Sequence, residues 1–300
     1  MSAVCSAPMP ATRILGVDFT SAPRARKPIT IASALVRAGR LRVDAVDAAR
    51  DFGEFDALLA RPGPWIGGFD FPFGLPRQLL ARLGWPHAPH GGTSAWARLV
   101  RHLEAMPRAE MVAAFRAWCD ARPAGAKFAH RATDLRAGSS PSMKWVNPPV
   151  SFMLQAGAPR LLAAGVTIPG MQPGDPRRIA LEAYPGMLAR AIVGRASYKS
   201  DARAGATVGR ESARRAILRA LACGLPLGLP VELPATVRDT CIHDARGDWL
   251  DAVLCAAQAA WAWQRRDEGF GLPDGIDPVE GWILTAPHAP VPETRAAAGH

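Results

Sequence analysis

Carboxylates stand at four places where the sequence predicts buried structure: Asp18, Asp70, Glu182 and the pair Asp248 and Asp251. A buried carboxylate is unfavourable by several kcal/mol unless it is paired or binds a cation. Asp248 and Asp251 are three residues apart, so both project from one face of a helix. Carboxylate oxygens without His or Cys suit Mg²⁺ or Mn²⁺ better than zinc, and two such ions about 4 Å apart can hydrolyse a phosphodiester. The pattern therefore predicts metal ligands at two strand ends and one helix: Asp18, Asp70, Asp248 and Asp251.

Each of these acids also has a structural interpretation. Asp18 and Asp70 can cap a helix or bond a turn, and Glu182 can pair with an arginine. Asp248 can be the N-cap of the helix that follows it. Asp251 is the hardest to explain in this way, because it lies within a nearly apolar helical stretch. No single acid indicates catalysis, and the prediction depends on the whole set.

The acids are positioned by elements that the apolar pattern predicts. Short apolar runs over 13–19 and 65–69 are typical of central strands buried on both faces, and an aspartate stands at the end of each. Ligands of open α/β sheets bind at the carboxyl ends of strands, so we expect Asp18 and Asp70 to lie at the binding edge. The other expected elements are strands 29–36, 41–46 and 178–184 and helices 51–59, 95–106, 110–119, 209–221 and 248–265.

The order of these elements predicts a single α/β domain over residues 1–300. Its core covers about 12–76 and 177–265. Between the two parts we expect a helical and loop insertion, about 77–176, which carries a basic loop over 127–149. The tail over 271–300 is rich in proline and is expected to be irregular.

The order of elements and the placement of the acids resemble the RNase H-like fold. In its junction-resolving nucleases, acids on the first strand, the fourth strand and the final helix bind the metals. The phrases GVDFTSAP (16–23), GFDFPFGLP (68–76), LEAYPG (181–186) and GDWLDAVLCA (247–256) closely resemble the domain-of-unknown-function family numbered 429, over about residues 14–263. That family is described as predicted RNase H-like nucleases.

This resemblance implies a mixed five-stranded RNase H-like sheet, flanked by helices and carrying a helical insertion. It also implies that Asp18 and Asp70 are metal ligands, with Asp248 and Asp251 as the helix acids. Glu182 becomes an additional acid near the site. Asp70 departs from the usual nuclease pattern, which often has Glu at that position.

The charge balance favours a polyanionic partner. The 36 Lys and Arg residues outnumber the 26 Asp and Glu residues, giving a net charge of +10, and only four of the cations are lysines. Arginine binds phosphate through a planar fork of donors, so nucleic acid, either DNA or RNA, is the expected partner. A GC-rich coding sequence would produce the same excess of arginine.

The sequence also predicts the surroundings in which the protein works. No run approaches the roughly 18 apolar residues of a membrane span, and residues 1–12 do not resemble a signal peptide. Five scattered cysteines, of which Cys5 is the first, indicate neither a disulfide framework nor a thiolate zinc site. We therefore expect a cytoplasmic protein without membrane contact.

Four further residues are candidates for substrate binding. The hydroxyls of Thr20 and Ser21 can bond a phosphate, and Lys144 and Lys199 can neutralise one; ordinary turn residues and solvated lysines are the alternatives. The basic loop is either substrate-facing or ordinary. Four arginines stand at helical spacing: Arg210, Arg214, Arg215 and Arg219. They form either a solvated helix face or a surface that binds along a phosphate backbone.

The predicted function is a divalent-metal-dependent nuclease that hydrolyses phosphodiesters of nucleic acid. In this hypothesis Asp18, Asp70 and Asp251 hold the metals, Asp248 shares or orients one, and Glu182 supports the site. One alternative is an ATP-dependent phosphotransferase or ATPase of the actin-like or sugar-kinase type, because those proteins duplicate the same core. Another is a nucleic-acid-binding module that keeps the nuclease scaffold without catalysis.

Overall fold

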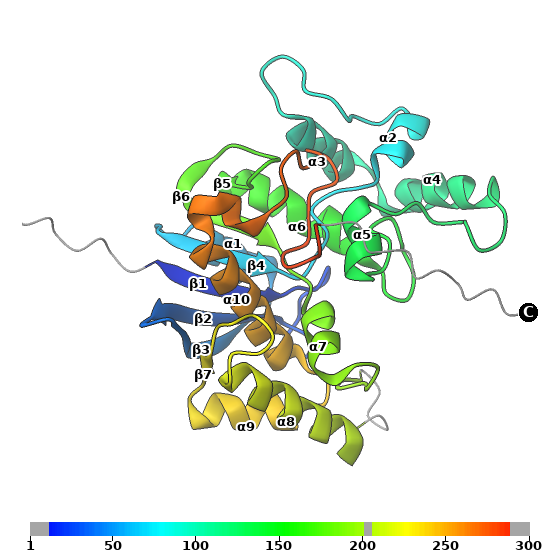
Figure 1. The fold of residues 1–300 in the computed structure, drawn as a ribbon. Helices are drawn as coiled ribbons and strands as arrows, with labels where there is room; N and C mark the ends of the chain where they lie inside the picture. The colour runs from blue at the N-terminus through cyan, green and yellow to red at the C-terminus, as the bar shows by residue number, and fades with distance from the viewer. Residues whose placement is uncertain (1–11, 201–205, 289–300) are drawn as a thin grey trace, which may run out of the picture.

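The protein is built around one mixed β-sheet with helices packed on both of its faces (Figure 1). The structure, a computed structural model, describes residues 12–200 and 206–288. Residues 1–11, which include Cys5, and residues 289–300 of the predicted tail lie outside the described residues. The predictions for these residues are therefore not tested by the structure.

Seven strands form the sheet in the order β5-β6-β4-β1-β2-β3-β7. The central strands β1, β4 and β6 are mutually parallel, and β2 runs antiparallel to both β1 and β3. The strands are β1 (Arg13–Asp18), β2 (Ile29–Arg37), β3 (Arg40–Ala49), β4 (Trp65–Phe69), β5 (Val166–Thr167), β6 (Asp175–Glu182) and β7 (Val231–Glu232).

The prediction of five strands is therefore corrected to seven. The five expected strands correspond to β1, β2, β3, β4 and β6, and the two additional strands lie at the sheet edges. β5 and β7 have two residues each, and a segment of that length carries no hydrophobic alternation from which a strand could be predicted.

Two groups of helices bury the two faces of the sheet, each around its own cluster of apolar side chains. The first group comprises α1 (Phe52–Leu59), α2 (Arg77–Leu83), α3 (Ala95–Ala105), α4 (Arg108–Asp120) and α6 (Val150–Ala164). Helix α5 (Ala132–Ala137) packs in a small third cluster, where Ala137 meets Ile283 and Ala286. The second comprises α7 (Pro185–Val193), α8 (Val208–Ala222), α9 (Ala235–His243) and α10 (Asp248–Gln264), followed by a 3₁₀ turn at Arg266–Gly271.

Local sequence signals explain several helix boundaries. Asp51 caps α1 as expected, because its Oδ1 accepts a hydrogen bond from the Glu54 amide at 2.9 Å. Pro185 is the first residue of α7, where proline's missing N–H is tolerated. Residues 272–288 have no helix, but they pack against the sheet, where the Leu284 amide donates to the Glu182 carbonyl at 2.8 Å.

Two glycines let α10 lie directly on the sheet. A Cβ atom at Gly16 on β1 would overlap the carbonyl oxygen of Ala252 and the amide nitrogen of Ala256. A Cβ at Gly68 on β4 would lie 2.6 Å from the carbonyl oxygen of Cys255. Only glycine permits such a close approach of backbones, so this packing sets the height of α10 above the carboxyl ends of β1 and β4.

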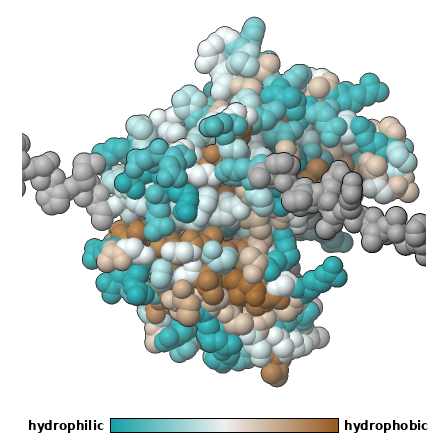
Figure 2. Space-filling model, viewed as in Figure 1, coloured by the Kyte–Doolittle hydropathy of each residue, from teal (hydrophilic) through white to brown (hydrophobic). Residues whose placement is uncertain are grey.

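None of the helices within residues 12–200 and 206–288 is long and apolar enough to span a membrane. Half-buried apolar side chains on the α10 side of the sheet include Ile192, Val193 and Trp261. A band of apolar surface crosses the lower half of the face in Figure 2, in the region of α7 and α10, and hydrophilic residues cover much of the rest.

Candidate active site

Asp18 and Asp70 lie side by side at the carboxyl edge of the sheet. Val17 on β1 is opposite Phe69 on β4, and the aspartates are the next residues of these two parallel strands. The Asp70 amide donates to the Val17 carbonyl at 2.9 Å, which continues the ladder to the aspartates. The expectation that both strands present an acid at one edge is therefore met.

Asp251 reaches the same edge from α10. Its side chain is almost completely buried, with 1% exposed. The Tyr198 hydroxyl donates to Asp251 Oδ1 at 2.6 Å, and the Lys199 ammonium forms an ion pair with Oδ2. Both carboxylate oxygens are thus bound by one short segment between α7 and α8.

The three aspartates are electrostatically coupled. Burial and then the charge of Asp251 raise the pKa of Asp18 well above its usual range, and Asp70 adds to the rise. Burial also raises the pKa of Asp70 to about 7; Lys199 opposes this rise, and Asp251 and Glu182 reinforce it. Such repulsion between neighbouring carboxylates is relieved when they bind a proton or share a cation.

Asp248 lies at the margin of this cluster. It is the first residue of α10 rather than the N-cap, which is Gly247. The loop residue Asp244 bonds the start of the helix instead, accepting from the Trp249 amide at 3.2 Å. Asp248 Oδ2 lies 3.3 Å from Arg246 Nε, and among the neighbouring charges that act on the pKa of Asp18, Asp248 contributes least.

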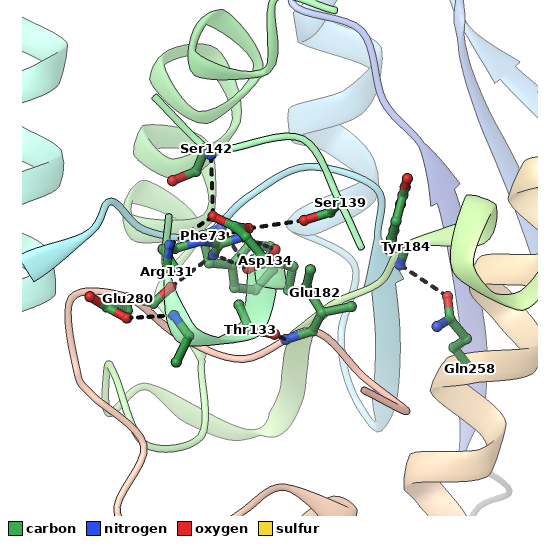
Figure 3. Close-up of polar contacts among 12 residues, drawn as sticks. Phe73, Arg131, Thr133, Asp134, Ser139, Ser142, Glu182, Tyr184, Gln258 and Glu280 are labelled. Carbon is green, nitrogen blue, oxygen red and sulfur yellow. Dashed lines mark hydrogen bonds and ion pairs between the residues drawn. The ribbon is translucent and has the colours of Figure 1, made fainter. Parts of the chain in front are cut away.

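Glu182 is held by a buried arginine (Figure 3). Two nitrogens of Arg131 donate to its two carboxylate oxygens at 2.7 Å each, and the Phe73 amide donates to Oε2 at 2.9 Å. Arg131 also binds Asp134, and all three charged side chains are at most 4% exposed. Glu182 therefore lies next to Asp70 with its charge already paired, as the structural interpretation of this residue expected.

The substrate-binding candidates occupy different places. Thr20 and Ser21 are half-buried in the loop directly after Asp18, and the Ser21 carbonyl accepts a hydrogen bond from Arg108 at 3.2 Å. Lys199 is in the acid cluster itself. Lys144 lies elsewhere, because its ammonium donates to the Asn147 carbonyl of its own loop at 2.6 Å.

A cavity of about 90 Å³ opens beside Asp70, between the sheet edge and the insertion. Ser139 and Ser140 of the basic loop line it, together with apolar side chains that include Met153 and Ile283. This part of the predicted substrate-facing loop therefore borders the cluster of aspartates.

The four arginines predicted on one helical face of α8 have different contacts. Arg210 donates to the Ser197 hydroxyl at 3.2 Å. Arg214 is 3% exposed and donates to the carbonyls of Tyr198 and Ile242 at 2.7 Å, so it is part of the packing. Arg215 pairs with Glu211 at 2.7 Å. Arg219 lines a groove of about 730 Å³, in which Arg40 and Arg238 also lie.

Sequence reasoning missed Tyr198 and Arg131 as residues that organise the site, and it placed Arg214 on a solvated or phosphate-binding face instead of in the packing. Tyr198 and Arg214 act across more than ten intervening residues, and no local pattern indicates these contacts. Arg131 and Asp134 do stand three residues apart, a spacing at which helical side chains pair, but the segment resembled an ordinary polar loop.

The acid cluster fits a hard divalent cation in its donor chemistry, because carboxylate oxygens from three elements meet there and repel one another. As the side chains lie, however, no three Asp, Glu, His or Cys residues in the described part of the chain stand close enough to enclose an ion. The Lys199 ammonium supplies positive charge at Asp251 instead.

The fold and the site together define an α/β protein with a mixed sheet and a cluster of aspartates at the carboxyl ends of its central strands. Residues 16–276 match the model of the family described as "Protein of unknown function (DUF429)", and the chain belongs to this family. No curated protein and no solved structure matches the chain.

Proposed function

We propose that the protein is a cytoplasmic, divalent-metal-dependent nuclease that hydrolyses phosphodiester bonds of DNA or RNA. The observation that carries this proposal is the meeting of Asp18, Asp70 and Asp251 at one edge of the sheet, where burial and mutual repulsion raise the pKa of Asp18 and Asp70. Groups with strongly perturbed pKa values in a cleft are typical of functional sites.

The topology supports an RNase H-like nuclease. Strands β3, β2, β1, β4 and β6 are neighbours in that order, with the first three antiparallel and the last three parallel. The acids come from the first strand, the fourth strand and the last helix, which is the pattern that the family resemblance implies.

In this proposal Asp18, Asp70 and Asp251 hold Mg²⁺ or Mn²⁺, and Asp248 orients the cluster from the start of α10. When bound, the ion supplies an activated water and stabilises the leaving oxygen. Asp70, with a pKa of about 7, holds or releases a proton near neutral pH. The Arg131 pair fixes Glu182 behind Asp70, so that this carboxylate keeps its position while the cluster changes charge.

Cationic side chains near the same edge favour a polyanionic substrate. The loop after Asp18 carries Arg24 and Arg26, both exposed. Burial raises the pKa of Asp248, and the nearby charges of Arg246 and Lys27 oppose this rise. Positive charge around an acidic pocket attracts a phosphate backbone while leaving the acids free to bind the cation.

The rival functions are less well supported. A phosphotransferase of the actin-like type needs a second copy of the core, and the described residues form a single sheet. Binding of nucleic acid without catalysis does not require three aspartates that lie close together and repel one another.

The proposal is tested by incubating single- and double-stranded DNA and RNA with the protein and Mg²⁺, Mn²⁺ or EDTA. We expect cleavage only with a metal, and loss of cleavage in Asp18→Asn and Asp251→Asn. Asp47→Asn, which changes an exposed carboxylate on β3, is the matched control and should retain activity. Full metal-dependent cleavage by both site variants would contradict the assignment, and ATP hydrolysis or binding without cleavage would favour the rival functions.

A further inference from the structure

Lys199 enters the acid cluster from the solvent side. Its side chain is 43% exposed, whereas the Asp251 carboxylate that it pairs with is 1% exposed. Tyr198, the preceding residue, binds the other oxygen of the same carboxylate. The ammonium therefore lies between solvent and a buried acid.

The position of Lys199 is fixed by its backbone. Arg214, itself buried, donates to the Tyr198 carbonyl at 2.7 Å, and the Ser200 amide donates to the Ala245 carbonyl at 2.9 Å. Gly247, the N-cap of α10 with φ +78°, gives the lysine room, because a Cβ there would lie 2.9 Å from Lys199 Cβ. Contacts on both sides of Lys199 thus direct its side chain toward Asp251.

The ammonium acts on the whole cluster. Its charge opposes the rise in the pKa of Asp18 and of Asp70, and both acids in turn raise the pKa of Lys199. The cluster holds three carboxyl groups and one ammonium, so it has more oxygen donors than the lysine alone pairs with, and such donors suit a divalent cation. An ion bound by Asp251 would nevertheless meet the ammonium at the same oxygen, where like charges repel.

We propose that Lys199 is the resident counter-cation of this cluster, and that Mg²⁺ or Mn²⁺ binds in exchange for its ammonium at Asp251. Lys199 thereby acts as a positioning residue that pairs with the buried carboxylate until the metal replaces it. This inference rests on the metal site of the proposed function.

The test is a calorimetric titration of the protein with Mn²⁺ in the absence of substrate, at a pH above the pKa of Asp70. Lys199→Gln removes the competing charge and should bind Mn²⁺ about tenfold more tightly than the wild type, since one displaced ion pair of about 1.4 kcal/mol corresponds to that factor. Lys199→Arg keeps the charge and should not gain affinity. Lys127→Gln, at an exposed lysine of the insertion, is the matched control and should bind as the wild type does.

Equal or weaker Mn²⁺ binding by Lys199→Gln, with a circular dichroism spectrum like that of the wild type, would overturn the exchange. If no variant binds Mn²⁺, both this inference and the proposed metal site are wrong. If Lys199→Gln binds more tightly but no form of the protein cleaves nucleic acid, the exchange stands and the nuclease proposal is wrong.

Discussion

The substitution Asp70→Asn should stabilise the metal-free protein, and the gain should grow with pH. Burial and the charges of Asp251 and Glu182 raise the pKa of Asp70 from 3.8 to about 7, against the opposing effect of Lys199. Asparagine has nearly the same shape and no charge. The variant therefore removes the unfavourable ionised state and keeps the side chain at the end of β4.

The sign follows from proton linkage. Between the two pKa values the folded protein holds a proton on Asp70 that the unfolded chain has lost, so stability falls as the pH rises through this interval. At about 1.4 kcal/mol per pKa unit, the rise to about 7 corresponds to roughly 4 kcal/mol above neutral pH, of which about 3 kcal/mol develops between about pH 5 and pH 8.5.

The assay is urea unfolding followed by circular dichroism, in EDTA, near pH 5 and near pH 8.5. The free energy of unfolding of Asp70→Asn, relative to that of the wild type, should rise by roughly 3 kcal/mol between the two conditions. Asp47→Asn, on the exposed side of β3, should show no such change. A difference that is the same at both pH values would show that the pKa of Asp70 is not raised in the folded protein and would refute this reasoning.

Three other predictions follow from the same contacts. Arg131→Met leaves Glu182 and Asp134 buried without their partner and should lower the free energy of unfolding in urea by about 3–5 kcal/mol; a loss below about 1 kcal/mol would mean that water replaces the arginine. Gly16→Ala forces α10 away from β1 and should destabilise the protein by about 3 kcal/mol or more. The control Gly209→Ala lies on α8, where the new Cβ meets no neighbour, and should stabilise the protein by up to about 1 kcal/mol. Equal effects of the two substitutions would rule out tight packing at Gly16. The affinity of the wild type for Mn²⁺ should increase as the pH rises through about 7, because the metal requires the ionised form of Asp70. The affinity of Asp70→Asn should lack this increase. A wild-type affinity that does not depend on pH would show that Asp70 is not a ligand.

The central part of the fold was predictable because its signals are local. The buried runs that end at Asp18 and Asp70 are continuous along the chain, and the apolar pattern of α10 gave that helix its observed bounds to within one residue. Five helices were not predicted. Among them, α6 has Pro159 in its interior and α5 lies within a segment rich in turn residues.

The geometry of the site was less predictable because its contacts connect distant parts of the chain. The pairing of Glu182 with Arg131 spans 51 positions, and the contact of Lys199 with Asp251 spans 52. Gly16 and Gly68 belong to two similar sequence motifs, but the sequence does not show why glycine is needed there. The reason is the close contact with α10, a helix that lies far along the chain at Asp248–Gln264. Composition and spacing identify which residue types could meet, whereas the fold determines their partners.

The most direct test of the account is a crystal structure of the protein soaked in Mn²⁺, with the ion located by its anomalous scattering. The account predicts a peak about 2.1 Å from carboxylate oxygens of Asp18 and Asp70, the usual distance for a small divalent cation, with the Lys199 ammonium no longer on Asp251. Manganese bound only elsewhere, with Lys199 still paired to Asp251, would contradict it.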